Sequence, residues 1–88
     1  MPYAVRLNRR AQKQLDRVPI SDADRVMDAI LALTDNPRPH GAVKLGGSAR
    51  RWRLRVGSYR VVYDIFDPDE MVNIEHILRR TTRTYKDI

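Results

Sequence analysis

Residues 51–66 read Arg-Trp-Arg-Leu-Arg-Val-Gly-Ser-Tyr-Arg-Val-Val-Tyr-Asp-Ile-Phe, and this stretch decides the fold. In its first six residues, basic and apolar side chains alternate, which is typical of a strand that presents different side chains to its two faces. Gly57-Ser58 predicts a two-residue hairpin turn. Tyr59–Phe66 is rich in Val, Ile and aromatic residues, so it predicts a central strand that is largely covered on both faces. The stretch therefore predicts an antiparallel hairpin.

The residues before this hairpin predict a strand and two helices. Tyr3–Leu7 alternates between residue types and predicts a short strand. Asn8 is expected to cap a helix that Pro19 ends, and Ser21 is expected to begin a second helix. Apolar residues recur at helical spacing at Ala11, Leu15 and Val18 in the first helix, and at Ala23, Val26, Met27, Ile30, Leu31 and Leu33 in the second.

Two irregular segments and a last strand complete the predicted order. Residues 35–49 contain two prolines and three glycines, so they predict a loop. Asp67–Glu70 predicts a turn, because its proline fixes φ at a corner position, and Met71–Leu78 predicts a strand. We therefore expect one α+β domain over residues 1–88, in the order β-α-α-β-β-β, with two N-terminal helices packed on one face of a small antiparallel sheet.

Composition excludes several classes of protein. The chain has no cysteine, which excludes a disulfide framework, a thiolate nucleophile and every Cys-ligated metal site. With His40 and His76 as its only histidines, we expect neither a metal site nor a cofactor. Its longest apolar run, Ala29–Leu33, is far too short to span a membrane, and charge begins at Arg6, so no signal-peptide core precedes it. These features predict a cytoplasmic protein without a membrane partner.

The basic residues are segregated along the chain. Fourteen of the 17 cations are arginines, and the net charge is +6. A GC-rich genome and a polyanionic partner both favour arginine over lysine, and the number alone does not separate them. However, residues 50–60 hold five arginines and no acid, residues 79–86 hold four cations and no acid, and residues 64–75 between them hold five acids. Because a composition bias does not explain this segregation, we expect a face that binds a polyanion.

The hairpin brings two of these arginines together. With Gly57-Ser58 as the loop, Arg55 pairs with Arg60 across the two strands. Directly opposed like charges destabilise a sheet, so their pairing favours an anion held between them over two solvated surface side chains. Tyr85 lies among cations near the end of the chain, where it could act as a general base, stack on a nucleobase or simply pack.

The segment Trp52-Arg53-Leu54-Arg55-Val56-Gly57-Ser58-Tyr59-Arg60-Val61-Val62-Tyr63, followed by an Arg-Arg pair and Tyr85, resembles the RelE branch of the RelE/ParE toxin superfamily. Lys44-Leu45-Gly46-Gly47 is similar to the Lys-Leu-x-Gly segment of that family, and the resemblance covers nearly the whole chain. It implies the toxin of a type II toxin–antitoxin pair, which a cognate antitoxin neutralises. Such a toxin enters the ribosomal A site and cuts mRNA there without metal, leaving a 2′,3′-cyclic phosphate and a 5′-hydroxyl.

The resemblance also implies roles for single residues. Arg53 and Arg55 match the two basic residues on the strand before the hairpin, and Arg60 matches an arginine that stabilises the transition-state phosphate. The basic residue after the last strand is Arg79 or Arg80, and Tyr85 matches the proposed base. Arginine is a poor proton donor, so the acid for the leaving group stays open. Further residues expected to bind RNA are Lys44, Arg50, Arg51, Arg83 and Lys86.

Two other functions fit the same pattern. A ParE-like toxin would inhibit DNA gyrase and would need no RNA-cutting residues, although the retained arginines and Tyr85 argue against it. A non-catalytic RNA-binding module would show salt-sensitive RNA binding without growth arrest.

Overall fold

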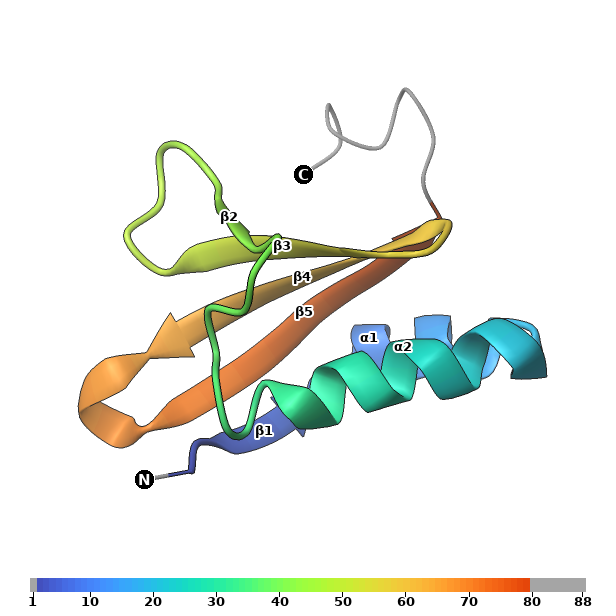
Figure 1. The fold of residues 1–88 in the computed structure, drawn as a ribbon, viewed down its shortest axis with the longest axis horizontal. Helices are drawn as coiled ribbons and strands as arrows, with labels where there is room; N and C mark the ends of the chain where they lie inside the picture. Colours follow the sequence, from blue (N-terminus) through green and yellow to red (C-terminus); the bar gives the residue numbers. More distant parts are fainter. Residues whose placement is uncertain (1, 80–88) are drawn as a thin grey trace.

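Two helices and five strands form the computed structural model, which describes residues 2–79 (Figure 1). The elements are β1 (Ala4–Leu7), α1 (Arg9–Asp16), α2 (Ile20–Ala32), β2 (Val43–Lys44), β3 (Arg51–Val56), β4 (Tyr59–Phe66), the 3₁₀ turn Asp67–Asp69 and β5 (Met71–Arg79). The predicted α+β order is confirmed, with β2 as an additional strand inside the predicted loop. No helix of the described residues is long and apolar enough to cross a membrane.

The five strands form one sheet in the order β1-β5-β4-β3-β2. The hairpin β3–β4 and the pairing of β4 with β5 are antiparallel, as predicted. However, β1 runs parallel to β5, so the sheet is mixed and the prediction of a wholly antiparallel sheet was wrong. The alternation of polar and apolar residues shows on which face of the sheet each side chain lies. It carries no information on whether the neighbouring strand is parallel or antiparallel. The two residues of β2, which pair with β3, are too few to show any periodicity.

The helix starts follow local capping rules with one exception. Asn8 caps α1 as predicted, because its Oδ1 accepts a hydrogen bond from the amide of Ala11 at 2.8 Å. The prediction that Ser21 begins the second helix was wrong, since α2 begins at Ile20 with Pro19 as its N-cap. The Pro19 carbonyl accepts the amides of both Asp22 and Ala23, at 2.9 and 2.8 Å, so no side-chain cap is used.

The hydrophobic core lies between the helices and one face of the sheet, and Figure 1 shows both helices on that side. The helical segment with its connections contributes Ala11, Leu15, Val18, Val26, Ile30 and Leu33, and the sheet contributes Val56, Tyr59, Val61, Tyr63, Ile65, Val72, Ile74 and Ile77. Leu31 was expected to join this core but is 59% exposed, because it lies on the outer side of α2. Neither helix of residues 2–79 covers the other face of the sheet.

Along the outer edge of β5, α1 takes over from β1. The parallel pairing with β1 reaches only from Met71 to Ile74. Beyond that point, the side chain of Arg10 donates from Nε to the carbonyl of Glu75 at 3.4 Å, and Gln14 Oε1 accepts the amide of Ile77 at 2.7 Å. These contacts cover backbone groups that an edge strand would otherwise expose. They also fix the position of α1 against the sheet.

Candidate functional site

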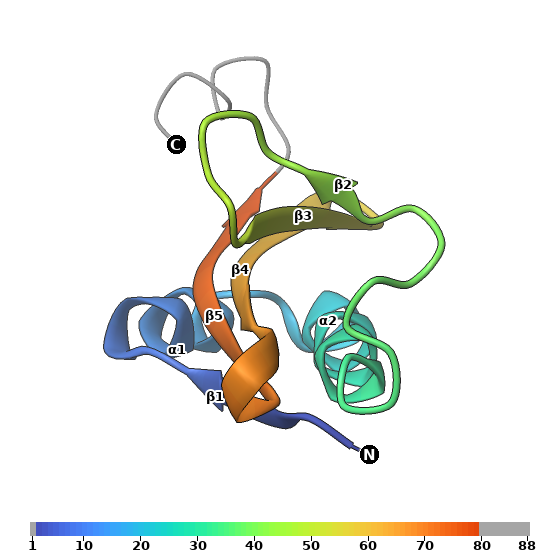
Figure 2. The same cartoon turned by 90° about the vertical axis from the view of Figure 1, so that its left-hand side faces the viewer.

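The candidate site is the sheet face opposite the helices, here called the open face. It presents the side chains of Arg51, Arg53 and Arg55 from β3, and of Arg60, Val62 and Asp64 from β4. Cross-strand partners share a face, and the residues between these point into the core. The three predicted site residues Arg53, Arg55 and Arg60 therefore lie on one face, as expected. The sheet twists strongly, so β3 crosses over β4 and β5 in Figure 2.

At the hairpin end of the open face, Arg55 lies directly opposite Arg60. This pairing was predicted from the two-residue turn, in which Gly57 has a φ of 58°. Arg55 is exposed, whereas Arg60 is only 3% exposed. Two opposed guanidinium groups, one of them almost buried, concentrate positive potential in a region of low dielectric. This end of the face is therefore suited to an anion.

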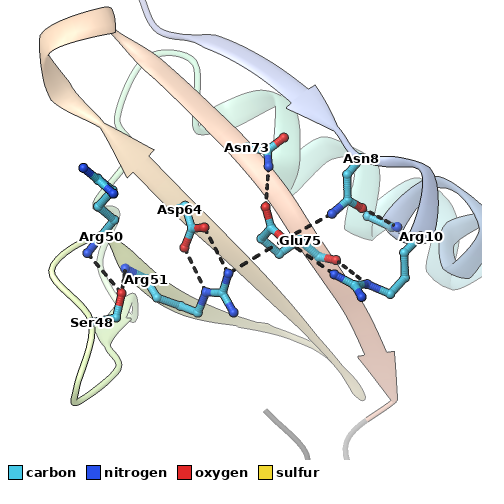
Figure 3. A network of polar contacts seen from close by, with 9 residues as sticks. Asn8, Arg10, Ser48, Arg50, Arg51, Asp64, Asn73 and Glu75 are labelled. Atoms are coloured by element: carbon cyan, nitrogen blue, oxygen red, sulfur yellow. Dashed lines mark hydrogen bonds and ion pairs between the residues drawn. The ribbon is translucent and has the colours of Figure 1, made fainter.

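At the other end of the open face, Arg51 is held by carboxylates (Figure 3). Its Nε and Nη2 donate to the two oxygens of Asp64 at 2.8 and 3.0 Å, and its Nη2 lies 3.7 Å from Glu75 Oε1. The hydrogen bond from Asp64 raises the pKa of Arg51 above its ordinary value. Glu75 is held in turn by the side-chain amides of Asn8 and Asn73. The side chain of Arg51 is therefore already engaged by two acids. Its expected role in RNA binding stays a prediction.

A β-bulge brings Glu75 to this network. The pairing of β4 with β5 shifts between Val62 and Tyr63, so that Val62 pairs with His76 and Tyr63 pairs with Ile74. The extra residue is Glu75, and bulges of this kind re-aim side chains. His76 is half-buried, and its Nδ1 is buried with no hydrogen-bond partner among residues 2–79. Burial lowers the pKa of His76, and nearby Arg10 and Arg51 lower it further.

Other predicted site residues lie elsewhere. Arg50 stacks on the ring of Phe66, with 5.1 Å from Cζ to the ring centroid. Lys44 is exposed on β2 and pairs with Trp52, which packs against the core on the helix side. Arg79 pairs with Tyr59, whose side chain belongs to the core, so it does not share the face of Arg55. The predicted residues Arg80, Arg83, Tyr85 and Lys86 lie outside the described residues.

Arg38 and the cations of α1 were not singled out from the sequence. Arg38 in the loop after α2 stacks on Trp52 at 5.4 Å and forms an ion pair with Asp67 at 2.8 Å. Tyr3 donates to the same carboxylate at 2.7 Å, and hydrogen bonds from Arg38 and Tyr3 hold the pKa of Asp67 below its usual range. The cations of α1 line a hollow of about 480 Å³. Their signal in the sequence is the recurrence of cations four residues apart.

The open face has the chemistry of a phosphate site. Guanidinium groups donate two parallel hydrogen bonds to phosphate oxygens and keep their charge at every physiological pH. Several of them on one surface can stabilise the extra charge that develops on phosphorus during transfer or cleavage. Within the described part of the chain, no group of three or more acidic or histidine side chains could hold a metal ion.

Comparisons with known proteins agree with one another. The family model described as "ParE toxin of type II toxin-antitoxin system, parDE" matches residues 5–83. A protein of Methanocaldococcus jannaschii named "Putative toxin RelE1" is 31% identical over 83 residues, which cover 91% of this chain and 92% of that protein. The archaeal RelE–RelB complex from Pyrococcus horikoshii contains a chain with a TM-score of 0.83 and 26% identity, covering 93% of this chain and 99% of that one. In the RelBE2 toxin–antitoxin complex from Mycobacterium tuberculosis, the values are 0.81 and 27%, with coverage of 91% and 93%.

Proposed function

This chain belongs to the RelE/ParE family of type II toxins, and from that premise we propose that it is an endoribonuclease that cuts mRNA in the ribosomal A site. Cleavage there would inhibit translation in the cytoplasm, where ribosomes and mRNA meet. Two of the similar solved structures are complexes of a toxin with its antitoxin, which supports a cognate antitoxin as the partner that neutralises this chain.

The single observation that carries the proposal is the pairing of Arg55 with Arg60 on the open face. In the proposed reaction, a ribose 2′-hydroxyl loses its proton and attacks the adjacent phosphorus, and the bond from phosphorus to the 5′-oxygen breaks. The products are a 2′,3′-cyclic phosphate and a 5′-hydroxyl, which takes up a proton. Charge builds on the phosphate in the transition state, and the two opposed guanidinium groups would stabilise it. The reaction uses no metal and no cofactor.

The remaining roles follow from where each side chain lies. Arg53 lies beside Arg55 on the same strand face and would hold the same phosphate or its neighbour. Arg79 faces the helix side, so we assign the phosphate contact after β5 to Arg80. Tyr85 would accept the proton of the 2′-hydroxyl, as its likeness to the tyrosine of RelE toxins suggests. Because arginine is a poor proton donor, water would protonate the leaving oxygen.

The further RNA contacts are proposed for the basic residues around this centre. Arg50 stacks on Phe66 at one end of the open face, and Lys44 is exposed on the outer strand β2. We propose that Arg50 contacts RNA beyond the cleaved phosphate, and that Lys44, which shares the face of Trp52, contacts RNA that passes around the edge of the sheet. The same role is proposed for Arg83 and Lys86 from their charge.

A second candidate function is inhibition of DNA gyrase. One observation favours it: the family model that matches this chain is named for the ParE toxin. Inhibition of gyrase would not require paired arginines on the open face. It would produce a DNA-damage response while mRNA stays intact.

The test is induction of the chain in cells, followed by mapping of mRNA 5′ ends. Arg55→Gln removes an exposed guanidinium from the proposed site, and Arg6→Gln removes another exposed one from β1, the edge strand farthest from the hairpin strand β3 on the β5 side. We expect new 5′ ends with the native chain and with Arg6→Gln. In Arg55→Gln, cleavage should fall by roughly 10²–10³, as expected for loss of one preorganised donor.

Two outcomes would contradict the proposal. Equal cleavage by Arg55→Gln and Arg6→Gln would remove Arg55 from the site. Intact mRNA together with a DNA-damage response would favour the gyrase alternative. The double variant Arg60→Ala with Tyr85→Phe extends the test to the other proposed groups, and its folding must be checked because Arg60 is nearly buried.

A further inference from the structure

The exposed side of α1 carries a row of cations that the proposed cleavage site does not use. Between residues 9 and 17 the chain has four cations and one acid. Arg9, Lys13 and Arg17 lie four residues apart and all are exposed. Side chains at this spacing lie on one side of a helix, about 6 Å apart along its axis. We call Arg9, Arg10, Lys13 and Arg17 the α1 row.

The α1 row opposes the helix dipole at its first turn and brings like charges together along the helix, whereas Lys13 in the last turn and Arg17 at the C-cap agree with the dipole. Positive charge near a helix N-terminus opposes the helix dipole, and the first turn of α1 contains no acid. Like charges four residues apart also destabilise a helix. Among the described residues, Arg10 lies 3.6 Å from Glu75, and no ion pair involves Arg9, Lys13 or Arg17. The one acid of this segment, Asp16, is engaged by the side chain of Gln12 at 3.1 Å. Residues kept against local preference point to a functional constraint.

The α1 row lines a hollow in the surface. Its four cations and Gln14 surround about 480 Å³. Gln14, one of its lining residues, is anchored to the sheet because its side-chain oxygen accepts a hydrogen bond from the amide of Ile77. A second hollow of about 240 Å³ shares Gln14 and Arg17 and extends to Tyr59 and Arg79. The two together run from α1 along the end of β5 to Tyr59 at the hairpin end of the sheet.

The surface chemistry favours a nucleic-acid backbone over a protein segment. A ribose-phosphate chain presents single negative charges at regular intervals, which suits cations at regular intervals. An acidic amphipathic peptide would also need exposed apolar residues to pack against. The large exposed apolar residues of the described chain are Ile20, Leu31 and Val43, and none of them belongs to α1.

We propose that the α1 row is a second RNA-binding surface, separate from the cleavage site, that holds the phosphate backbone of structured RNA. The inference rests on the proposed function for its partner, which would be ribosomal RNA. The chain would then contact the ribosome through the α1 row while mRNA lies against the open face. The two surfaces meet where Arg10 and Arg51 both lie near Glu75, so the test changes Lys13 and Arg17, which form no ion pair among the described residues.

The test measures binding to an RNA duplex of about 16 base pairs, to vacant ribosomes and to poly-glutamate, each at several salt concentrations. The double variant Lys13→Gln with Arg17→Gln lowers the net charge by two, and Arg6→Glu on β1 lowers it by the same amount. Thermal unfolding checks that both variants fold. We expect the double variant to bind duplex and ribosomes at least about tenfold more weakly, with a salt slope smaller by about two, and Arg6→Glu to change little.

The outcomes separate this inference from the proposed function. Adding Lys13→Gln and Arg17→Gln should weaken duplex binding by the same factor in the Arg55→Gln chain as in the native chain, although Arg55→Gln has lost cleavage. If the native chain cuts no mRNA but its duplex binding still depends on Lys13 and Arg17, the proposed function fails and the RNA-binding surface stands. Equal duplex affinity and salt slope in the two charge-matched variants would overturn the surface. Tight binding of poly-glutamate that depends on the same two residues, without binding of the duplex, would also overturn it in favour of an acidic protein partner.

Discussion

Replacing Tyr63 by Phe tests how the central strand holds the loop that follows α2. Tyr63 is fully buried, and its hydroxyl donates to the carbonyl of Pro37 at 2.8 Å. Burial raises the pKa of this hydroxyl from about 10 to about 12, against the opposing positive charge of Arg38. Tyr63→Phe removes the hydrogen bond and the titration together, and it changes almost nothing in the shape of the core.

The expected effect of Tyr63→Phe depends on pH. At pH 8 the variant should lose about 1–3 kcal/mol of unfolding free energy, because the carbonyl of Pro37 loses its buried partner. The unfolded native chain releases the Tyr63 proton near pH 10, whereas the folded chain keeps it until about pH 12. This contribution to stability is therefore complete below pH 10 and is lost as pH rises toward 12. At pH 11 the native chain has lost about 1.4 kcal/mol of unfolding free energy through this group, and the variant has lost none.

The assay is urea unfolding followed by the fluorescence of Trp52, the single tryptophan. The difference between native chain and variant should shrink by about 1.4 kcal/mol from pH 8 to pH 11, since all other titrating groups are common to both. An unchanged difference would refute the reasoning that burial controls this hydroxyl. A variant as stable as the native chain at pH 8 would refute the role of the hydrogen bond.

Two further substitutions test local geometry. Gly57→Ala should lower the unfolding free energy by about 1–2 kcal/mol, because φ is 58° at the hairpin turn. Gly46→Ala is the control and should lower it by less than about 0.5 kcal/mol, because Gly46 has open space around it and no left-handed φ. Equal costs would contradict this reading of the turn. Asn8→Ala should cost about 0.5–2 kcal/mol, since the residue caps α1 and also donates to Glu75 at 3.2 Å. Ser21→Ala, inside α2, is the control and should change stability by less than about 0.5 kcal/mol.

Local signals in the sequence predicted the hairpin and its arginine pair. A two-residue loop sets the register of the strands that it joins, so Gly57-Ser58 was sufficient to pair Arg55 with Arg60. The alternation of basic and apolar residues likewise predicted which side chains lie on each face of the hairpin. In the segment that resembles RelE toxins, Tyr59 and Tyr63 belong to the core and Arg60 to the open face.

Contacts between distant segments could not be predicted in this way. The acids of residues 64–75 read as a block separate from the arginines, yet Asp64 lies directly opposite Arg51 in the sheet. Glu75 joins them only because of a bulge, which depends on the register of two strands and has no signature within one. The parallel pairing of β1 was missed for the same reason. The α1 row was visible as cations four residues apart, but only the hollow beside them distinguishes a surface for a partner from a solvated helix face.

The parallel pairing of β1 with β5 bears on the order in which the molecule assembles. It joins Ala4 to Met71, across most of the described chain, whereas β3, β4 and β5 follow one another through short turns. Closing so long a loop costs more entropy than closing a turn, so the three-stranded meander is expected to form early and β1 to dock late. The first strand to be synthesised would then be the last to find its place. Val5→Ala in β1 should accordingly speed unfolding and leave the folding rate nearly unchanged, and a slower folding rate would contradict this order.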